Sequence, residues 1–382
     1  TGFILLINKM KPVIRNILRS AVYQLKYMDS VPDSAVCNEA VKLAVKKGFG
    51  TLRGFVNGVL RNVARGLDQV EYPTEGIERL SVVYSMPEWI LKLWKKTYDL
   101  DVIESMLQAF QEETPVTIRC NLAKTTPENL KESLQKEGVT VTPHPYLSYA
   151  FWIQDYDHLS ELESFQKGEF YVQDISSMLV GELADPKKGD RVIDVCAAPG
   201  GKALHVAEKL RGTGSVEARD LSLYKVGLIT ENIERSGLTN IHAVQKDATV
   251  CDADVKDAAD LVIADLPCSG LGVLAKKTDL KYKATEQSTK ELAGLQREIL
   301  KNAASYVRPG GTLIYSTCTI NPAENIENVH WFLKEFPEFV LDPIADRLCS
   351  TLQNSVEEAG CLQLLPGIHK SDGFFIARFG KK

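Results

Sequence analysis

The stretch DVCAAPGGKALH, residues 194–205, indicates the fold of the longest part of the chain. It joins the end of an apolar run, RVIDVC, to a helical pattern, GKALHVAEKL, through a turn that contains Gly200 and Gly201. Pro199 and the glycine spacing differ from the GxGxxG turn of dinucleotide sites, and Gly-Lys is not followed by Ser or Thr as in a P-loop. Because glycine lets a tight turn approach a ligand closely, the stretch predicts a strand, a ligand-binding turn and a helix.

Strands and helices alternate from about residue 166 onward. The expected strands are RVIDVC, SVEARD, IHAVQ, LVIADLP and GTLIYSTC. The expected helices are GKALHVAEKL, LYKVGLITENIERSG, a long helix near 285–307, and AENIENVHWFLKEF. Alternation of this kind predicts an α/β fold with a doubly wound, mostly parallel sheet. The late run FFIARF predicts a final antiparallel strand.

Two smaller parts precede this α/β part. Residues 1–70 have apolar residues at helical spacing, for example Ile14, Ile17, Leu18, Ala21, Val22 and Leu25, and we expect this part to be all-helical. Residues 71–165 predict a linker and a small α+β module, with a strand at 116–121 and a helix that Thr126 caps. The expected domains are therefore 1–70, 71–165 and 166–382.

Composition and cysteine usage limit the class of protein. The chain has 382 residues, 44% hydrophobic and 25% charged, which is ordinary for a globular protein. No apolar run reaches the roughly 18 residues that a membrane span needs, so we expect no membrane partner and a cytoplasmic location. The opening TGFILLINKM lacks an initiator Met and a signal-peptide core, and we expect it to be a cut end. The eight cysteines form no CxxC pair, which predicts reduced thiols and no metal site.

The net charge of −5 is unevenly distributed. Residues 1–70 hold eleven Lys or Arg and four acids, a net charge of +7, which leaves −12 for the rest of the chain. A basic domain attached to an acidic body indicates a polyanionic partner, although a merely solvated basic face would give the same composition. The loop lysines Lys276, Lys277, Lys281 and Lys283 present the same two alternatives, phosphate contacts or a solvated loop.

Acidic residues and cysteines follow the predicted parallel strands. Asp194, Asp220, Asp247 and Asp265 end or follow the first four, and ligands bind beyond the carboxyl ends of such strands. A single acid there is more often a cap or turn residue, but four at one edge indicate a ligand site. Asp220 lies where a carboxylate accepts hydrogen bonds from ribose hydroxyls. Cys268 and Cys318 follow the fourth and fifth strands, and each is either a small apolar filler or part of the same pocket.

The motifs DVCAAPGGK, DLPCSG and STCTINPAEN, in this order and spacing, resemble the signature of the S-adenosylmethionine-dependent RNA cytosine-C5 methyltransferases. QDISSM at 173–178 and DGFFIARF at 372–379 also resemble that family. RSAVYQLKYMDSVPDSAVCNEAV and GFVNGVLRNVARG resemble the NusB-like RNA-binding domain of one branch, which methylates a cytosine of bacterial 16S rRNA. The resemblance covers essentially the whole chain and implies a Rossmann-like methyltransferase behind an all-α NusB-like domain and a small α+β RNA-binding module.

The resemblance also implies a role for each motif residue. Cys318 is the expected nucleophile, Asp265 contacts the base, and Cys268 assists product release. The cofactor, S-adenosyl-L-methionine, is expected to contact Asp220 through its ribose, Asp247 through its adenine, and Asp265. The turn expected around its methionine part consists of Cys196, Ala197, Ala198, Pro199, Gly200, Gly201 and Lys202. The implied partner is 16S rRNA, as free rRNA or an early particle, and we expect a monomer.

Three alternatives remain open at this level. A non-catalytic RNA-binding scaffold would keep the basic helical domain but would not need the paired thiols. An NAD-dependent dehydrogenase would need GxGxxG, which is absent. Within the family, the competing substrate is a cytosine in tRNA or large-subunit rRNA, because these motifs determine the chemistry better than the target.

Overall fold

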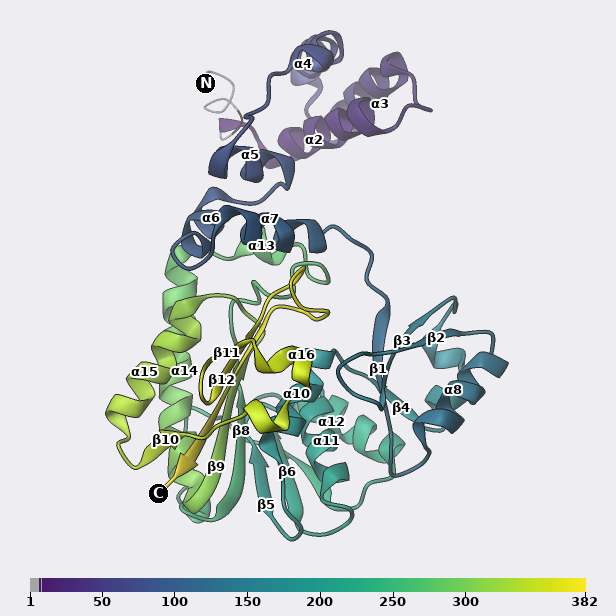
Figure 1. Ribbon diagram of the computed structural model, residues 1–382. Helices are drawn as coiled ribbons and strands as arrows, with labels where there is room; N and C mark the ends of the chain where they lie inside the picture. Colours follow the sequence, from purple (N-terminus) through teal and green to yellow (C-terminus); the bar gives the residue numbers. More distant parts are fainter. Residues whose placement is uncertain (1–6, 8) are drawn as a thin grey trace. The chain divides into compact units, whose positions relative to one another are not determined.

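The computed structural model describes residue 7 and residues 9–382. The expectations about the opening TGFILLINKM therefore fall largely outside the described residues. The chain divides into two compact units, Thr1–Thr74 and Glu75–Lys382 (Figure 1). The domain boundaries expected at residues 70 and 165 stay a prediction.

The first unit is a small helical bundle, as its apolar spacing predicts. Its helices are α2 (Pro12–Tyr27), α3 (Asp33–Lys46) and α4 (Arg53–Gly66), with the short 3-10 helices η1 (Gly50–Leu52) and η2 (Leu67–Gln69). Ile14, Ile17, Leu18 and Ala21 of α2 are buried against α3 and α4. The unit therefore has a hydrophobic core of its own.

The second unit begins with three helices and a small antiparallel sheet. The helices are α5 (Gly76–Val83), α6 (Glu88–Trp94) and α7 (Leu100–Ala109). The sheet has the order β2-β3-β1-β4, with β1 (Val116–Cys120), β2 (Thr140–Pro143), β3 (Ala150–Gln154) and β4 (Phe170–Val172). It is accompanied by α8 (Pro127–Lys136), η3 (Leu159–Glu161) and α9 (Glu163–Gln166). As predicted, Thr126 caps α8, where its side chain accepts a hydrogen bond from the backbone of Asn129.

The rest of the second unit is built on a nine-stranded sheet. Its strands are β5 (Arg191–Asp194), β6 (Ser215–Asp220), β7 (Ile241–Gln245), β8 (Ala259–Asp265), β9 (Val307–Thr317), β10 (Phe339–Leu341), β11 (Val356–Glu358), β12 (Cys361–Leu364) and β13 (Phe374–Lys381). The order is β11-β12-β13-β9-β8-β5-β6-β7, and β10 pairs with β13. Strands β5 to β9 pair in parallel, and β13 is antiparallel to β9. The predicted parallel sheet and final antiparallel strand are confirmed.

Helices cover both faces of this sheet, as the alternating pattern predicts (Figure 1). The helices of this part are α10 (Ile175–Ala184), α11 (Gly201–Lys209), α12 (Leu223–Ser236), α14 (Glu286–Tyr306), α15 (Ile326–Glu335) and α16 (Ser350–Gln353), with η4 (Ala253–Val255), η5 (Pro322–Glu324) and η6 (Ala345–Arg347). The short α13 (Leu280–Lys283) packs through Leu280 with α6 and α7 instead. In β8, Ile263 packs in the cluster with α10 and α11, whereas its neighbour Val262 packs with α14 and α15. Successive strand residues thus fill two separate cores.

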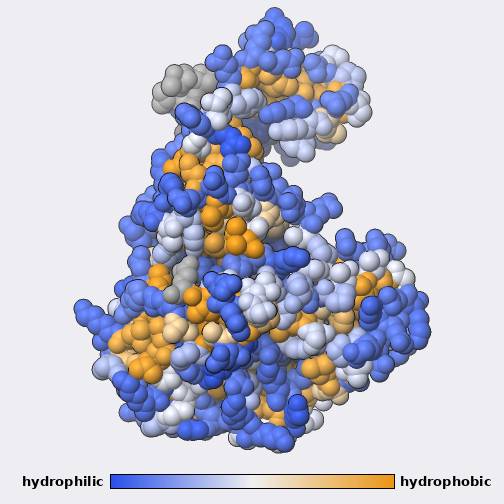
Figure 2. Space-filling view, viewed as in Figure 1, coloured by the Kyte–Doolittle hydropathy of each residue, from blue (hydrophilic) through white to orange (hydrophobic). Residues whose placement is uncertain are grey.

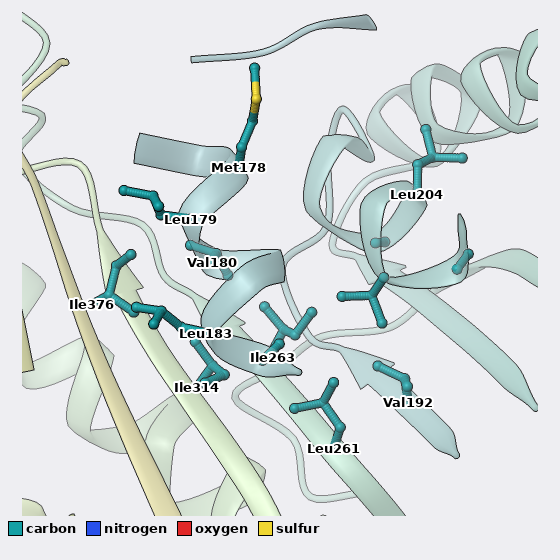
Figure 3. Packing of buried hydrophobic residues seen from close by; sticks show 14 of the residues in the cluster. Met178, Leu179, Val180, Leu183, Val192, Leu204, Leu261, Ile263, Ile314 and Ile376 are labelled. Carbon is teal, nitrogen blue, oxygen red and sulfur yellow. The ribbon is translucent and has the colours of Figure 1, made fainter. Parts of the chain in front are cut away.

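The helix α10 is central to one of these cores. Leu179 and Leu183 lie next to Ile314 of β9 and Ile376 of β13 (Figure 3). The polar Ser176 at the start of the helix is also buried. Because this helix is buried on nearly all sides, it lacks the apolar stripe by which a surface helix is recognised in a sequence.

A buried ion pair joins the small sheet to helix α11, which packs on the large sheet. Arg119 of β1 is fully buried, and its guanidinium lies 2.9 Å from the carboxylate of Glu208 in α11. It also donates to the side-chain oxygen of Gln173 over 2.8 Å and lies 4.3 Å from the ring centroid of Tyr171. Burial raises the pKa of Glu208, which Arg119 partly offsets. The guanidinium is therefore the main compensation for a carboxylate that is almost entirely buried.

We predict that Arg119→Ala lowers the free energy of unfolding by about 3–5 kcal/mol, because it leaves a buried carboxylate uncompensated. Urea denaturation measures this loss. Adding Glu208→Gln to Arg119→Ala should recover part of it, since the uncompensated charge is then gone. Lys136→Ala, at an exposed position of α8, is the control and should change stability by less than about 0.5 kcal/mol. A loss below about 1 kcal/mol for Arg119→Ala would contradict this role.

The surface is mainly hydrophilic on the face that Figure 2 shows, with hydrophobic residues in separate patches. Among the described residues, no helix has both the length and the apolar character needed to cross a membrane.

Candidate active site

The carboxyl ends of the five parallel strands meet at one edge of the large sheet. The order β9-β8-β5-β6-β7 brings Asp265 at the end of β8 beside Asp194 at the end of β5, and Asp194 beside Asp220 at the end of β6. Asp247 follows β7, the outermost of the five. This is the edge where parallel α/β sheets bind ligands.

The glycine-rich turn after β5 is held by its neighbour β6. The backbone N–H of Ala197 donates to the carbonyl of Arg219 over 2.7 Å, and that of Ala198 donates to the carboxylate of Asp220 over 3.0 Å. Gly200 has a φ of 108°, a left-handed value that favours glycine, and it begins helix α11. The predicted turn residues, from Cys196 to Lys202, therefore lie directly against the acidic end of β6.

Asp194 is a buried acid with spare hydrogen-bonding capacity. Its side chain is fully buried, one oxygen accepts from the backbone of Cys196 over 3.3 Å, and the other oxygen has no hydrogen-bond partner. Burial, and next the charge of Asp265, raise the pKa of Asp194 to about 7. A cationic or hydrogen-bond-donating ligand is the partner that such a group lacks.

Asp220 and Asp247 differ in how strongly they are already engaged. The buried Asp220 accepts from two backbone amides, and the ammonium of Lys225 lies 3.1 Å away. One Asp247 oxygen accepts from the backbone and hydroxyl of Thr249, hydrogen bonds that lower the pKa of this exposed carboxyl. A carboxylate offers about four acceptor positions, so both acids keep capacity for a further donor.

The two cysteines predicted to share a pocket are in contact. The Sγ atoms of Cys268 and Cys318 lie 3.2 Å apart, although 50 residues separate them in the chain. The hydrogen bond from Cys268 is the largest influence that lowers the pKa of the Cys318 thiol, while the pKa of Cys268 is raised well above its usual range. The pair is therefore polarised toward a thiolate on Cys318, the reactive form of cysteine.

The contacts of the Lys202 side chain were not predicted from the sequence. Its ammonium lies 2.7 Å from the carboxylate of Asp265, on the side opposite the hydroxyl of Ser316, which donates to the other oxygen over 2.7 Å. Burial alone would lower the pKa of Lys202, but Asp265 and Asp194 raise it above its usual value. The positive charge of Lys202 also helps to lower the pKa of Cys318. The glycine turn thus provides a cation beside the thiols as well as a backbone surface.

Glu324, in the motif after Cys318, was also not predicted to have a role. It is fully buried, and its carboxylate accepts from the backbone of Ser269 over 2.9 Å and from the side chain of Asn321 over 2.9 Å. It thereby ties the loop after Cys268 to the loop after Cys318. Two asparagines that flank the acid in the motif, Asn321 and Asn325, were the available signal for a buried polar turn.

The four loop lysines differ in their surroundings. Lys276, Lys277 and Lys283 are exposed. Lys276 also lies 2.9 Å from Asp174 and 2.6 Å from Asp372, so it already has carboxylate partners. Lys281 is buried, which fits neither a phosphate contact nor a solvated loop, and burial lowers its pKa.

In the described part of the chain, no three His, Cys, Asp or Glu side chains are grouped in a way that could hold a metal ion.

Three family models match the chain. The model described as 16S rRNA methyltransferase RsmB/F matches residues 182–380, a NusB family model matches residues 5–65, and a ferredoxin-like domain of RsmF/B-like methyltransferases matches residues 86–156.

Relatives and solved structures resemble the chain along most of its length. A probable ribosomal RNA small subunit methyltransferase B of Bacillus subtilis is 37% identical over 98% of this chain and 84% of its own. The crystal structure of PH0851 superposes with a TM-score of 0.83 at 28% identity, covering 98% of this chain and 84% of that one. The structure of NSun6 from Pyrococcus horikoshii with SFG gives a TM-score of 0.69 at 25% identity, covering 78% and 99%.

The residues at the strand ends fit S-adenosylmethionine. This cofactor carries a sulfonium and an ammonium charge together with ribose hydroxyls, which are cations and donors. The site offers the partnerless oxygen of Asp194 and the free capacity of Asp220 and Asp247. These residues and the turn from Cys196 to Gly201 are those we expect to hold it.

We predict that S-adenosylmethionine binds more tightly as the pH rises from 6 to 8. A carboxyl with a pKa of about 7 is largely protonated at pH 6 and largely ionised at pH 8, and the cationic cofactor prefers the ionised form. Calorimetric titration should show up to roughly a tenfold gain in affinity, levelling off above pH 7. Asp194→Asn should bind weakly throughout this pH range. Equal pH dependence in wild type and Asp194→Asn would show that Asp194 does not face the cofactor.

Proposed function

The chain belongs to the 16S rRNA methyltransferase RsmB/F family, and we propose that it methylates carbon 5 of a specific cytosine in 16S rRNA through a covalent bond between Cys318 and carbon 6. It is an S-adenosylmethionine-dependent methyltransferase, and the cofactor supplies the methyl group. The observation that carries the proposal is the contact between Cys268 and Cys318 beside the Lys202–Asp265 pair.

A thiolate is needed because carbon 5 of cytosine is a poor nucleophile. When the sulfur of Cys318 bonds to carbon 6, the electron pair of the C5–C6 double bond shifts toward carbon 5, which becomes enamine-like and reactive. Asp265 is positioned by Ser316 and Lys202, and its proposed role is to hold the N3/N4 edge of the base while the adduct forms. Lys202 favours the attacking form of Cys318 through its positive charge.

Release of the product is the proposed task of Cys268. After methyl transfer, the proton on carbon 5 leaves to a base, the C5–C6 double bond re-forms, and the sulfur of Cys318 departs as a thiolate. The thiol of Cys268 lies 3.2 Å from that sulfur and can donate a hydrogen bond to the departing thiolate. The same contact that favours the attacking thiolate therefore favours the leaving one.

The substrate must reach this pocket as an unstacked base, because a base within a helix cannot expose carbon 6 to a thiol at a strand end. The name of the Bacillus relative supports small-subunit rRNA over the alternative targets, tRNA and large-subunit rRNA. The proposed partner is therefore 16S rRNA, as free rRNA or an early particle, and the proposed location is the cytoplasm. A monomer suffices, since every proposed site residue comes from one chain.

We predict different outcomes for the two cysteine variants. Cys318→Ala can form no bond to carbon 6 and should lose methyl transfer almost entirely. Cys268→Ala should still attack but release slowly, and so accumulate a protein–RNA adduct that migrates as a slow band on a denaturing gel. The adduct should be absent from the double variant.

The opposite assignment has its own signature. An adduct in Cys318→Ala, together with an inactive Cys268→Ala that forms none, would reverse the two roles. Full methylation by both variants would show that the cysteines are small apolar fillers. Cys251→Ala, at an exposed cysteine outside the pair, is the matched control and should behave as wild type.

The helical first unit is proposed to hold RNA by its charge. Arg53, Arg61 and Arg65 of α4 are exposed, and Arg61 and Arg65 hydrogen-bond Asn57 and Asn62 of the same helix, which orders their side chains. In the described part of the unit, the ion pair between Lys42 and Glu39 is the one close contact between opposite charges. Most of its positive charge is therefore available to phosphates.

We predict that the double variant Arg61→Gln/Arg65→Gln binds 16S rRNA more weakly and with a flatter salt dependence. Removal of two phosphate contacts should reduce the slope of log K against log salt by roughly 1–2. Filter binding at several salt concentrations measures the slope, and cofactor affinity should not change. Lys334→Gln, at an exposed position of α15, is the control. An unchanged slope in the double variant would mean that this face is only solvated.

A further inference from the structure

A cavity of about 410 Å³ lies in the second unit and is lined by neither catalytic cysteine. Phe110 at the end of α7 and Trp152 of β3 form part of its wall. Asp174, Lys276 and Asp372 form a charged part. We call it the Trp152 cavity. Nothing in the mechanism proposed above uses it.

Backbone contacts place the Trp152 cavity next to the thiols. The N–H of Gly272 donates to the carbonyl of Cys318 over 3.1 Å, and the N–H of Gly373 donates to the carbonyl of Gly272 over 2.9 Å. A Cβ atom at Gly272 would lie 1.9 Å from the carbonyl oxygen of Gly373, so these backbones pack without room for a side chain. Asp372, which precedes Gly373, lines the cavity. The cavity wall and the loop of the nucleophile are thus one packed structure.

A second connection runs through Phe374. Its ring centroid lies 5.4 Å from the ammonium of Lys202, which pairs with Asp265. Phe374 follows the cavity residue Asp372 by two positions. Phe374 thus links the cavity wall to the Lys202–Asp265 pair.

The Trp152 cavity combines a flat aromatic wall with a polar edge. Trp152 is half-buried, and its ring packs against His144 with centroids 4.4 Å apart, which holds it in place. The ammonium of Lys370 lies 5.9 Å from the Trp152 centroid. Lys276 is fixed between Asp174 and Asp372, so carboxylate oxygens and ammonium hydrogens are presented together. A nucleobase has this same combination, with an aromatic face for stacking and donors and acceptors at its edge.

The size of the cavity decides how much RNA it holds. A volume of about 410 Å³ is at the lower end of the range for small-ligand pockets, which suits one nucleotide and not a longer segment. Lys370 beside the ring supplies a positive charge for a phosphate. The carboxylate of Asp372 suits a base edge with amino or imino hydrogens, whereas Asp174 already accepts from Ser176, Lys276 and the backbone of Asp372.

We propose that the Trp152 cavity binds one unpaired nucleotide that flanks the target cytosine in the same RNA strand. The proposal rests on the proposed function, because it assigns a second nucleotide to the same substrate. Stacking on Trp152 supplies the binding, and the carboxylate of Asp372, which accepts from Lys276 through one oxygen, contacts the base edge through the other. Holding a neighbour out of the stack also assists the target base to leave it.

The test is a cycle that pairs protein variants with RNA variants. The RNA is a short 16S fragment that the wild type methylates, with an abasic site placed in turn at each position around the target. Fluorescence anisotropy without cofactor measures the dissociation constants. One flanking abasic site should weaken binding to wild type roughly tenfold and binding to Trp152→Ala very little. Trp152→Phe keeps a stacking face and should keep the wild-type pattern.

Two further variants keep the test decisive. Thr114→Phe places a ring at an exposed cavity position and should reduce the effect of the flanking abasic site even if Trp152→Ala does not fold. Trp331→Ala, at a half-buried tryptophan of α15, is the matched control and should keep the wild-type pattern.

The outcomes separate the two proposals. Suppose that the wild type methylates the fragment, but that an abasic site at every flanking position weakens binding to wild type and to Trp152→Ala equally. The cavity proposal is then wrong, and the proposed function stands. If wild type and Trp152→Ala differ most when the abasic site replaces the target cytosine, the cavity holds the target itself. That result also overturns the proposal. If the wild type methylates carbon 5 of no cytosine in any 16S fragment, the proposed function fails.

Discussion

Parallel pairing between β8 and β9 is the constraint on which the candidate active site depends. The register sets Asp265 opposite Ser316, and each strand then continues into a loop that carries one cysteine. The backbone N–H of Leu266 donates to the carbonyl of Ser316 over 3.0 Å, which extends the pairing beyond the strand end. A slip of one residue would turn Asp265 to the other face of the sheet and separate it from Lys202 and the thiols. The chemistry therefore depends on strand register before it depends on any single side chain.

Charge is the second constraint on this edge of the sheet. Asp194, Asp220 and Asp265 end neighbouring strands, and the partly buried ammonium of Lys202 lies 2.7 Å from Asp265. The raised pKa of Asp194 shows the cost of this arrangement, because the buried carboxyl keeps its proton up to about pH 7. A site that binds a cationic cofactor gains from the same arrangement, since the cofactor brings the missing positive charge. Functional sites commonly break local rules of stability in this way.

The main sheet, and the meeting of several candidate site residues at one of its edges, were predictable for a clear physical reason. A strand buried on both faces leaves a short apolar run, and parallel strands must end at the same edge, so Asp194, Asp265 and Cys318 could be placed together from the sequence. Helix α10 could not be predicted from periodicity, because it is buried on nearly all sides. The direction of a side chain could not be predicted either, which is why Lys202 was expected only as part of the turn around the cofactor and not as the partner of Asp265.

The other contacts that the sequence did not predict involve partners that are distant in the chain. Lys276 looked like a free loop cation, but its carboxylates, Asp174 and Asp372, lie about a hundred residues away on either side. Glu324 has a role only because the loop of Ser269 reaches it. Short-range patterns carry no information on such contacts, whereas the family motifs did place both cysteines in one site.

The central claim, that Cys318 is the nucleophile, can be tested most directly by identifying the sulfur that bonds to the RNA. A 16S fragment with 5-fluorocytosine at the target should hold the adduct, because fluorine cannot leave carbon 5 as a proton does. Cys268 and Cys318 lie on different tryptic peptides, since Lys276 and Lys301 separate them. Mass spectrometry of the trapped complex should find the nucleotide on the peptide that contains Cys318. A nucleotide on the Cys268 peptide, or no adduct with an RNA that is otherwise methylated, would contradict the account.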